Sequence, residues 1–272
     1  MKMGRKNRGF LWNLYPVQVL RLKLGKARDG SPLRELPYVF IIGFNKSGTR
    51  SLTSLLEHAG LPGVHWDKNR LVHRMLVNIK KGKRVLSGYD SRFLVYADLI
   101  LSDESKVVEG NQFFPRLYDE YPNSFFILNT RPTEKWIDSR VRHGNGPFLA
   151  RSMKILGTSE PTEVMDLWRS QKEMHESKVR EFFSDKPGRL VEVNIESDNP
   201  SQLLSQALPF EVDDVGWRHV GRSRYNTQTS LERASQLSQL PESELVKIRL
   251  SVPKKVGKAV SRAFEKVWTF RR

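Results

Sequence analysis

Cysteine is absent from the 272-residue sequence, which excludes both a disulfide framework and a thiolate metal site. Long apolar runs are absent too. The most apolar stretch near the N-terminus, residues 10–20, is interrupted by Asn13, Pro16 and Gln18, whereas a helix that crosses a bilayer needs about 20 predominantly apolar residues. No small-residue cleavage pattern follows this stretch, so the sequence predicts neither a signal peptide nor a membrane span. We therefore expect a cytoplasmic protein.

Acidic residues are scarce at the two ends of the chain. Residues 1–34 contain nine basic residues (Lys or Arg) and one acidic residue, and residues 247–272 contain the same numbers. The segment between them has 28 basic and 28 acidic residues. The two ends therefore carry the whole net charge of +16. Two interpretations of the basic ends stay open: surfaces that contact an anionic membrane or another polyanion, or solvated tails. Because the body is neutral, nucleic acid is not an expected partner.

Apolar strands alternate with amphipathic helices along the middle of the chain. Continuous apolar runs at 38–42, 124–128 and 190–194 are typical of strands buried on both faces of a parallel sheet. The pattern also predicts a short strand at 63–66, helices at 52–59, 70–81, 114–121, 134–142 and 164–183, and an N-cap at Thr133, and it is ambiguous at 93–100 and 106–109. The alternation predicts an α/β fold, a three-layer α/β/α domain with a central parallel sheet.

Three regions follow from these patterns. We expect a basic N-terminal extension at 1–36, the α/β domain at 37–225 and a basic helical C-terminal extension at 226–272. The last extension has apolar residues on one predicted helical face between 252 and 272. That face fits either an anionic membrane surface or packing against the domain.

A glycine-containing loop joins the first strand to the first helix. From Gly43 to Ser51 it is Gly-Phe-Asn-Lys-Ser-Gly-Thr-Arg-Ser. Such a loop presents successive backbone N–H groups and the positive end of a helix dipole to an anion. Lys46 adds a positive charge, and the hydroxyl groups of the loop add further donors. An ordinary turn would need only the glycines; the position between a buried strand and a helix favours anion binding.

The loop differs from those that bind nucleoside triphosphates. The pattern G-x-x-x-x-G-K-[ST] matches Gly43 and Gly48, but the lysine, Lys46, precedes the second glycine. The strand at 124–128 is followed by Asn129 rather than by an aspartate that would hold Mg²⁺. The loop therefore favours a donor that reacts without a metal, and a metal-dependent nucleotide kinase is the alternative enzyme.

The segment Lys46-Ser47-Gly48-Thr49 resembles the 5′-phosphosulfate loop of sulfotransferases that use 3′-phosphoadenosine-5′-phosphosulfate (PAPS). In this family an arginine at a strand end and a serine eight residues later bind the 3′-phosphate of the donor, and Arg131 and Ser139 have this spacing. Residues 121–139 are similar to bacterial members throughout, and the resemblance extends over 38–208. It implies PAPS as donor, no metal, a P-loop-like fold, and the following donor-binding residues: Asn45, Lys46, Ser47, Gly48, Thr49, Arg50, Ser51, Arg131, Ser139 and Arg222.

The resemblance leaves the catalytic base open. Cytosolic members use a histidine at the end of the strand before the arginine-bearing strand, and Asp98 stands at the comparable place. Heparan-type members use a glutamate where this chain has Ser54, and we expect Glu57, one turn later, to be solvated. His65 is the second candidate because imidazole titrates near neutrality, although a structural role fits it equally well. We therefore predict catalytic roles for Lys46, Asp98 and His65.

The predicted activity is transfer of a sulfuryl group from PAPS to a hydroxyl or amine of a carbohydrate, lipid or small-molecule acceptor. Besides the kinase, one alternative from another class remains, a non-catalytic module that binds polyanions through the basic ends. Such a module predicts steeply salt-dependent binding that survives loss of Lys46.

Overall fold

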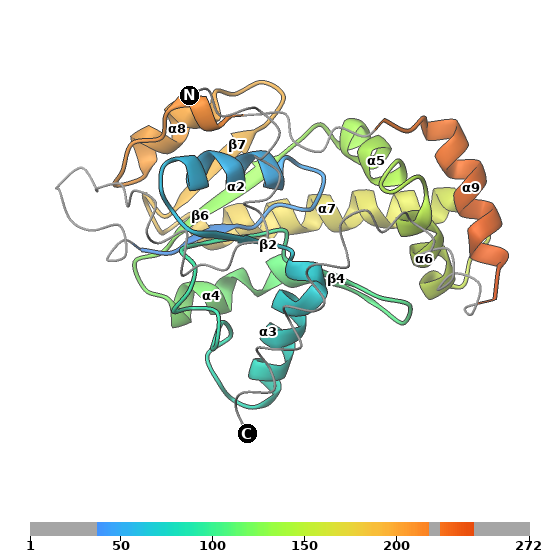
Figure 1. Cartoon of the computed structure of the whole chain (residues 1–272), viewed down its shortest axis with the longest axis horizontal. Coiled ribbons are helices and arrows are strands. Elements are labelled where there is room, and N and C mark those ends of the chain that lie inside the picture. Colours follow the sequence, from blue (N-terminus) through green and yellow to red (C-terminus); the bar gives the residue numbers. More distant parts are fainter. Residues whose placement is uncertain (1–36, 218–223, 242–272) are drawn as a thin grey trace, which may run out of the picture.

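A parallel sheet forms the centre of the structure. The computed structural model describes residues 37–217 and 224–241 (Figure 1). Within these residues five parallel strands are hydrogen-bonded in the order β2-β3-β1-β6-β7. The strands of the sheet are β1 (Val39–Ile41), β2 (Gly63–His65), β3 (Val95–Ala97), β6 (Phe125–Thr130) and β7 (Leu190–Asn194). The helices are α2 (Thr49–His58), α3 (Arg70–Lys80), α4 (Phe114–Glu120), α5 (Thr133–Val141), α6 (Pro147–Leu156), α7 (Pro161–Phe183), α8 (Pro200–Ala207) and α9 (Thr227–Gln239).

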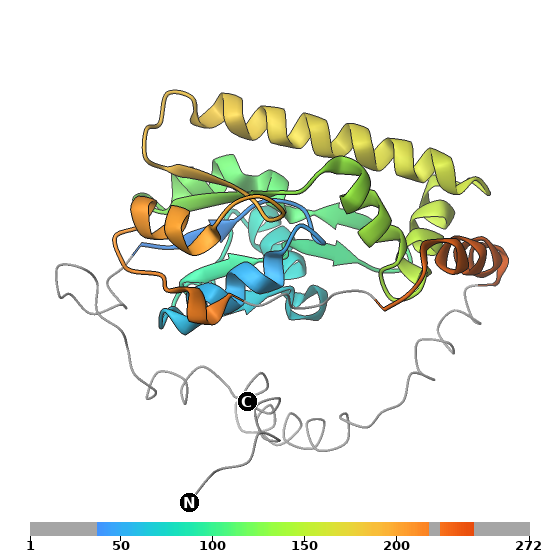
Figure 2. The ribbon, with the colours of Figure 1, turned by 90° about the horizontal axis from the view of Figure 1, so that it is seen from above.

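Side chains alternate along β1, and the two sets face different helices. Val39 and Ile41 pack in a cluster with apolar residues of α2 and α8, whereas Phe40 and Ile42 pack with those of α3, α4 and α7. In Figure 1, α2 and α8 lie above the sheet and α3 and α4 below it, and Figure 2 shows α7 along the side opposite α2 and α8. The predicted three-layer α/β/α fold with a parallel sheet is therefore confirmed.

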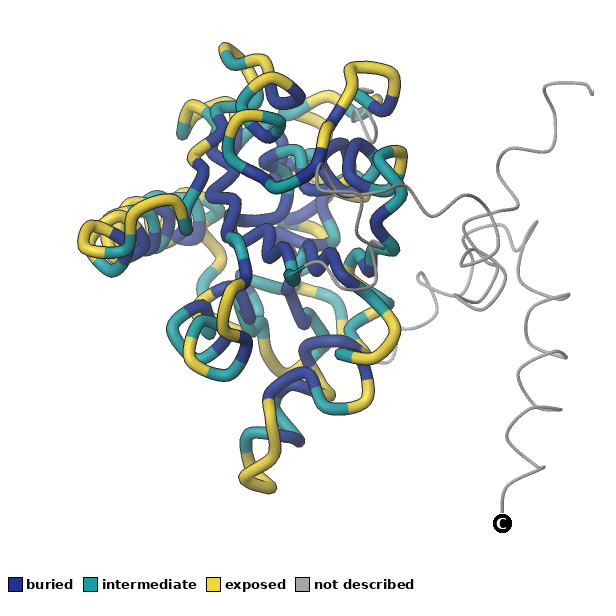
Figure 3. The backbone as a smooth tube through the Cα atoms, turned by 90° about the vertical axis from the view of Figure 1, so that its left-hand side faces the viewer, coloured by how far each residue is buried: buried dark blue, intermediate teal, exposed yellow. Residues whose placement is uncertain are grey.

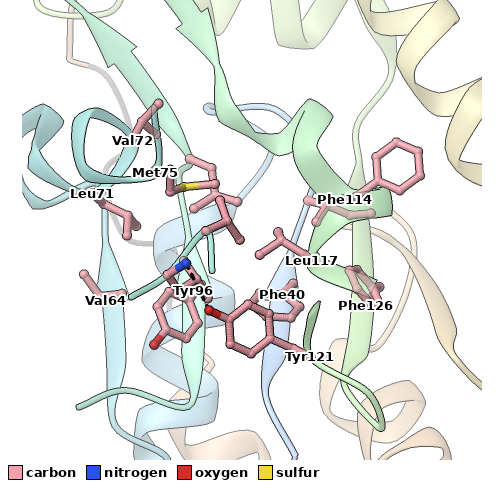
Figure 4. Packing of buried hydrophobic residues seen from close by; sticks show 14 of the residues in the cluster. Phe40, Val64, Leu71, Val72, Met75, Tyr96, Phe114, Leu117, Tyr121 and Phe126 are labelled. Carbon is pink, nitrogen blue, oxygen red and sulfur yellow. Dashed lines mark hydrogen bonds between the residues drawn. The ribbon is translucent and has the colours of Figure 1, made fainter. Parts of the chain in front are cut away.

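The lower layer is rich in aromatic rings. Figure 4 shows Phe40, Tyr96 and Phe126 from three neighbouring strands against Met75 of α3 and Leu117 of α4. The ring centroids of Phe40 and Phe126 lie 5.2 Å apart. The buried backbone gathers at the centre of the molecule, as Figure 3 shows. Rings of this size contribute much of the apolar area that leaves water on folding.

The order of the strands places three loops side by side. From β1 the chain proceeds to β2 and β3 on one side of β1, and then to β6 and β7 on the other. Open α/β sheets bind ligands outside the carboxyl ends of strands at such a change of direction. The loop after β1, Asp98 after β3 and Arg131 after β6 consequently follow neighbouring strand ends.

Helices α5, α6 and α9 form a group at one end of the sheet, on the right in Figure 1. They share a third apolar cluster with α7, which includes Trp136, Phe148, Met153, Trp168 and Leu237. The closest association is between α6 and α9. This cluster covers the region beyond the carboxyl ends of the central strands.

A short antiparallel hairpin, β4 (Ile100–Ser102) and β5 (Val107–Glu109), follows β3. It extends toward α6 in Figure 1. Its turn is held by Asp103, whose Oδ1 accepts hydrogen bonds from the backbone N–H groups of Ser105 and Lys106 at 2.9 and 3.0 Å. The ambiguous segments 93–100 and 106–109 are thus β-structure, in strands too short to produce a clear alternation.

The predicted cap of α5 is wrong. The cap position is Pro132, with φ −49°, and no side chain in the described part of the chain caps the helix. Thr133 is already the first helical residue, and its hydroxyl lies 3.4 Å from Nζ of Lys172 on α7. The basic ends, Arg222 and the predicted helical face at 252–272 lie outside the described residues. Among the helices that are described, none combines the length and the apolar character that crossing a bilayer requires.

Candidate active site

The loop after β1 is fastened by Asn129 at the carboxyl end of β6. The Asn129 Oδ1 accepts a hydrogen bond from Gly43 N at 2.8 Å, and its Nδ2 donates to Ser47 O at 2.7 Å. A Cβ on Gly43 would lie 2.1 Å from Asn129 O, so only glycine fits there. One buried amide therefore fixes both halves of the loop. Sequence reasoning missed this role because the bonds join residues more than 80 positions apart.

Two residues of the loop adopt left-handed backbone conformations. Lys46 has φ 69° and Gly48 has φ 77°. At Gly48 a Cβ would also meet Ile195 at 2.9 Å, so glycine is required by space as well as by φ. For a lysine this conformation costs about 1 kcal/mol, and such strain concentrates at functional sites. Helix α2 then begins at Thr49. The first N–H groups of the helix therefore point toward the loop, where an anion would bind.

A buried arginine supports the loop from below. Arg140 of α5 is fully buried, donates through Nε to Asn45 Oδ1 at 2.9 Å and forms an ion pair with Glu109 of β5. Four rings surround its guanidinium at 4.7 to 5.5 Å, those of Trp136, Trp168, Phe148 and Phe44. The backbone O of Asn45 accepts from Trp136 Nε1 at 2.8 Å. Asn45, predicted to bind the donor, is buried with its side chain directed to Arg140.

Arg131 and Ser139 are placed by β6 and α5. Arg131 follows β6 directly, and its Nη2 lies 2.6 Å from Glu196 Oε1. The second oxygen of Glu196 accepts from Lys135 Nζ at 3.0 Å. Within the described residues Arg131 Nε is buried without a hydrogen-bond partner. Ser139 lies two turns along α5 and is buried, and the bond from Trp136 to Asn45 holds that helix against the loop.

The two predicted bases lie together beside the loop. Asp98 follows β3 with φ 54°, and His65 ends β2. The His65 Nε2 is 3.1 Å from Thr49 Oγ1 and 3.6 Å from Asp98 Oδ2. Asp98 Oδ1 is buried and, so far as the described residues show, unpartnered. A buried carboxylate oxygen without a donor is costly, so this atom is available to a ligand's hydroxyl group.

A comparison with protein-family models finds one match, the sulfotransferase domain, over residues 38–192. The chain belongs to the sulfotransferase family. A search of curated proteins found no match. The matched residues contain the loop, Arg131 and Ser139, on which the sequence resemblance rested, and also Asp98.

The charges of the candidate site alter each other's titration. Burial lowers the pKa of Lys46; Asp98 opposes this effect, and Arg50 and Arg131 add to it. Burial raises the pKa of Asp98 to about 6, against the attraction of Lys46. Burial, with a contribution from Arg50, lowers the pKa of His65 to about 3. A neutral imidazole therefore faces Asp98, and their contact at 3.6 Å is dipolar rather than an ion pair.

His143 is a site residue that sequence reasoning missed. Burial lowers its pKa to about 4, and Lys46 and Arg140 contribute further. It follows α5 in the turn after the cap residue Arg142, and its backbone N donates to Arg140 O at 3.1 Å. Because it lies outside the helix, no helical spacing could have indicated it. A neutral His143 adds a hydrogen-bonding group beside Lys46 without adding to the positive charge.

Glu57 is partly buried, whereas we expected it to be solvated. Burial raises its pKa to about 7. It nevertheless lies outside the site. Its Oε1 is close to Gly63, at the amino end of β2, whereas His65 is at the carboxyl end. No three His, Asp or Glu side chains within residues 37–217 and 224–241 gather closely enough to hold a metal ion.

Proposed function

We propose that this sulfotransferase uses PAPS as donor and transfers the sulfuryl group to a hydroxyl group, or an amine, of a carbohydrate, lipid or small-molecule acceptor. The observation that carries the proposal is the loop Gly43–Ser51, fastened by Asn129, with Lys46 close enough to Asp98 for their charges to interact and with His65 in contact with Asp98. A preorganised cation and fixed N–H donors match the charge that a departing phosphate develops.

The residues that would hold the donor fall into two groups. The loop would bind the phosphosulfate, through backbone N–H groups and the side chains of Lys46, Ser47, Thr49, Arg50 and Ser51. Arg131 and Ser139 would bind the 3′-phosphate, joined by Arg222, which lies outside the described residues. The buried, unpartnered Nε of Arg131 is one observation that fits an anionic ligand, because an unpaired buried donor is rarely left in a native site.

The reaction needs one base and one site for leaving-group charge. The acceptor oxygen forms a bond to sulfur while its proton passes to Oδ1 of Asp98, and the bond from sulfur to the bridging phosphate oxygen breaks. Lys46 and the loop N–H groups stabilise the negative charge on that oxygen. Asp98 is a better base than His65, because its raised pKa lies closer to neutral pH. His65 and Thr49 would then orient Asp98 and the loop.

Titration calorimetry with 3′-phosphoadenosine-5′-phosphate (PAP), the donor's product, tests the donor assignment. We expect micromolar binding in the absence of Mg²⁺. Sulfuryl transfer from PAPS to a panel of acceptors would then be followed by the release of PAP. Binding of Mg-ATP without binding of PAP would replace the proposal with a kinase, and salt-dependent polyanion binding alone would replace it with a binding module.

The pH dependence of the rate tests the base. Because Asp98 must be ionised and its pKa is about 6, we expect kcat/KM to rise about tenfold per pH unit below pH 6 and to level off above pH 7. Asp98→Asn should remove this limb and lower the rate about 10²- to 10⁴-fold. His65→Gln is the matched control and should keep the limb. A limb near pH 6 that persists in Asp98→Asn would assign the base to another group.

We do not expect Asp98→Asn to lose activity by unfolding. Since folding raises the Asp98 pKa from its ordinary 3.8 to about 6, the folded state binds the proton more tightly than the unfolded chain. Ionisation of Asp98 therefore costs stability as the pH rises from about 4 to about 6. At pH 7 the asparagine variant carries no charge at position 98, and thermal unfolding should show it to be at least as stable as the wild type.

Glu196 competes with the donor for Arg131. Its two oxygens accept from Arg131 and Lys135, so a 3′-phosphate would have to share these cations with a carboxylate. We expect Glu196→Gln to tighten PAP binding about fivefold, corresponding to about 1 kcal/mol for a partly exposed charge. Adenosine-5′-phosphosulfate, which lacks the 3′-phosphate, is the control ligand and should gain nothing. Equal gains for both ligands would place the 3′-phosphate away from Arg131.

A further inference from the structure

The turn after β2 is held in an unfavourable conformation. Four consecutive residues, none of them glycine, have positive φ: Trp66 at 60°, Asp67 at 45°, Lys68 at 52° and Asn69 at 71°. Each of these conformations is unfavourable for a residue that carries a side chain. Strain of this kind persists only where surrounding contacts fix it, and it clusters at ligand sites.

The turn presents the ring of Trp66 to solvent beside the catalytic group. Trp66 follows His65 directly, and its backbone N donates to Ala97 O, one residue before Asp98, at 3.1 Å. Its indole Nε1 donates to Asn69 Oδ1 at 2.9 Å, yet the residue remains 38% exposed. The polar edge of the ring is thus satisfied within the protein while a large apolar surface stays accessible. An exposed and immobilised aromatic ring is suited to stacking on a flat ligand.

An arginine is attached to the same structure. Asn69 Nδ2 donates to Ser102 O at 2.8 Å, and Ser102 N donates to Asn69 Oδ1 at 3.1 Å. The Ser102 Oγ accepts from Arg151 Nη1 of α6 at 2.9 Å. One chain of hydrogen bonds therefore joins Trp66, Asn69, Ser102 and Arg151 across the turn, the β4–β5 hairpin and α6.

The positive charge of Arg151 also acts in the region of the active site. Its charge acts on His143, as do the charges of Lys46 and Arg50, and all three oppose protonation of that imidazole. In the proposed function, Lys46 and Arg50 bind the phosphosulfate group of the donor. Arg151 is not among these donor-binding residues, and the hydrogen bonds through Ser102 and Asn69 join it instead to Trp66, next to His65.

We propose that Trp66 and Arg151 form the acceptor subsite, which takes a ring-bearing alcohol or phenol with a carboxylate group. The ring lies against the indole, the carboxylate binds the guanidinium, and the hydroxyl group is directed to Asp98. Planar guanidinium groups pair with carboxylates through two parallel hydrogen bonds. The assignment of this subsite to an acceptor rests on the proposed function, and its preference for an acidic ring compound can be measured without catalysis.

Two matched pairs of probes test the subsite by calorimetry, each with and without PAP. The aromatic pair is 4-hydroxybenzoate and 4-hydroxybenzyl alcohol; the sugar pair is methyl β-D-glucuronide and methyl β-D-glucoside. Within each pair only the carboxylate differs. We expect the acid of at least one pair to bind about tenfold more tightly than its neutral partner, and the pair that shows the larger difference identifies the ring as aromatic or sugar.

Variants separate the two contacts. Arg151→Met should reduce the acid preference to within about twofold, whereas Trp66→Ala should weaken both members of the preferred pair about tenfold and Trp66→Phe should restore most of the loss. PAP binding should remain unchanged in all three. The exposed residues Leu167 and Arg169 of α7 provide control variants, Leu167→Ala and Arg169→Met, which should match the wild type.

Each failure has a distinct meaning. Equal binding of acid and neutral probes by the wild type would overturn the subsite, and so would an acid preference that survives Arg151→Met. If PAP still binds in that case, the donor assignment stands. If the wild type binds no PAP but keeps an Arg151-dependent acid preference, the subsite stands and the donor assignment is wrong.

Discussion

Replacing Lys46 with alanine is expected to lower the rate of sulfuryl transfer about 10²- to 10³-fold, the usual cost of removing one preorganised group that stabilises leaving-group charge. Lys46 is held by its own backbone conformation, φ 69°, and by the loop that Asn129 fastens. Its charge therefore needs no rearrangement when the bond to the bridging oxygen breaks. Single-turnover measurement with PAPS gives the rate, and calorimetry with PAP gives the affinity.

Lys46→Gly separates the charge from the backbone. Glycine adopts a positive φ without cost, whereas lysine and alanine share the same strain, so a loss caused by loop geometry would differ between the two variants. We expect both to be equally slow. Lys80→Ala, on the exposed end of α3, is the matched control for a surface lysine. A rate within about threefold of the wild type in Lys46→Ala would remove Lys46 from the mechanism.

Local patterns predicted the parts of this sulfotransferase that depend on neighbouring residues. β1 and β6 could be predicted because both faces of each strand are buried, which requires an apolar side chain at nearly every position. The loop could also be recognised from neighbouring residues, since the groups that we propose to bind an anion are consecutive in the sequence. The β4–β5 hairpin was not, because strands of three residues are too short for a period to emerge.

The rest of the site depends on contacts between distant segments. Asn129 was interpreted only as a position that lacks an aspartate, and its amide proves to clamp a loop more than 80 residues earlier. Arg140 binds Asn45 across 95 positions and Glu109 across 31. No spacing rule identifies such partners, because the strand order that brings them together is itself a product of folding. Trp66 is a similar case, since it stands in a turn of four residues with positive φ that no sequence pattern predicts.

Arg140→Met should be the most destabilising of the substitutions considered, lowering the free energy of unfolding by about 3 to 5 kcal/mol. Arg140 is fully buried and Glu109 nearly so, with 0% and 8% of their side chains exposed. Removing the cation leaves the Glu109 carboxylate uncompensated in an apolar cluster, and burial already raises the pKa of that carboxyl. Urea unfolding at pH 7 measures the loss. For comparison, Arg169→Met breaks an exposed pair with Glu134 and should cost less than about 1 kcal/mol.

The double variant Arg140→Met/Glu109→Gln decides whether the stranded charge is the cause. With no carboxylate left to bury, we expect it to recover at least half of the lost stability, because neutral side chains of similar size can replace a buried ion pair at little cost. Catalysis should not recover with it. Asn45 Oδ1 would still lack its donor, Arg140 Nε, and the loop that carries Lys46 would lose its support on that side. A double variant that regains both stability and rate would show that Arg140 serves the fold alone.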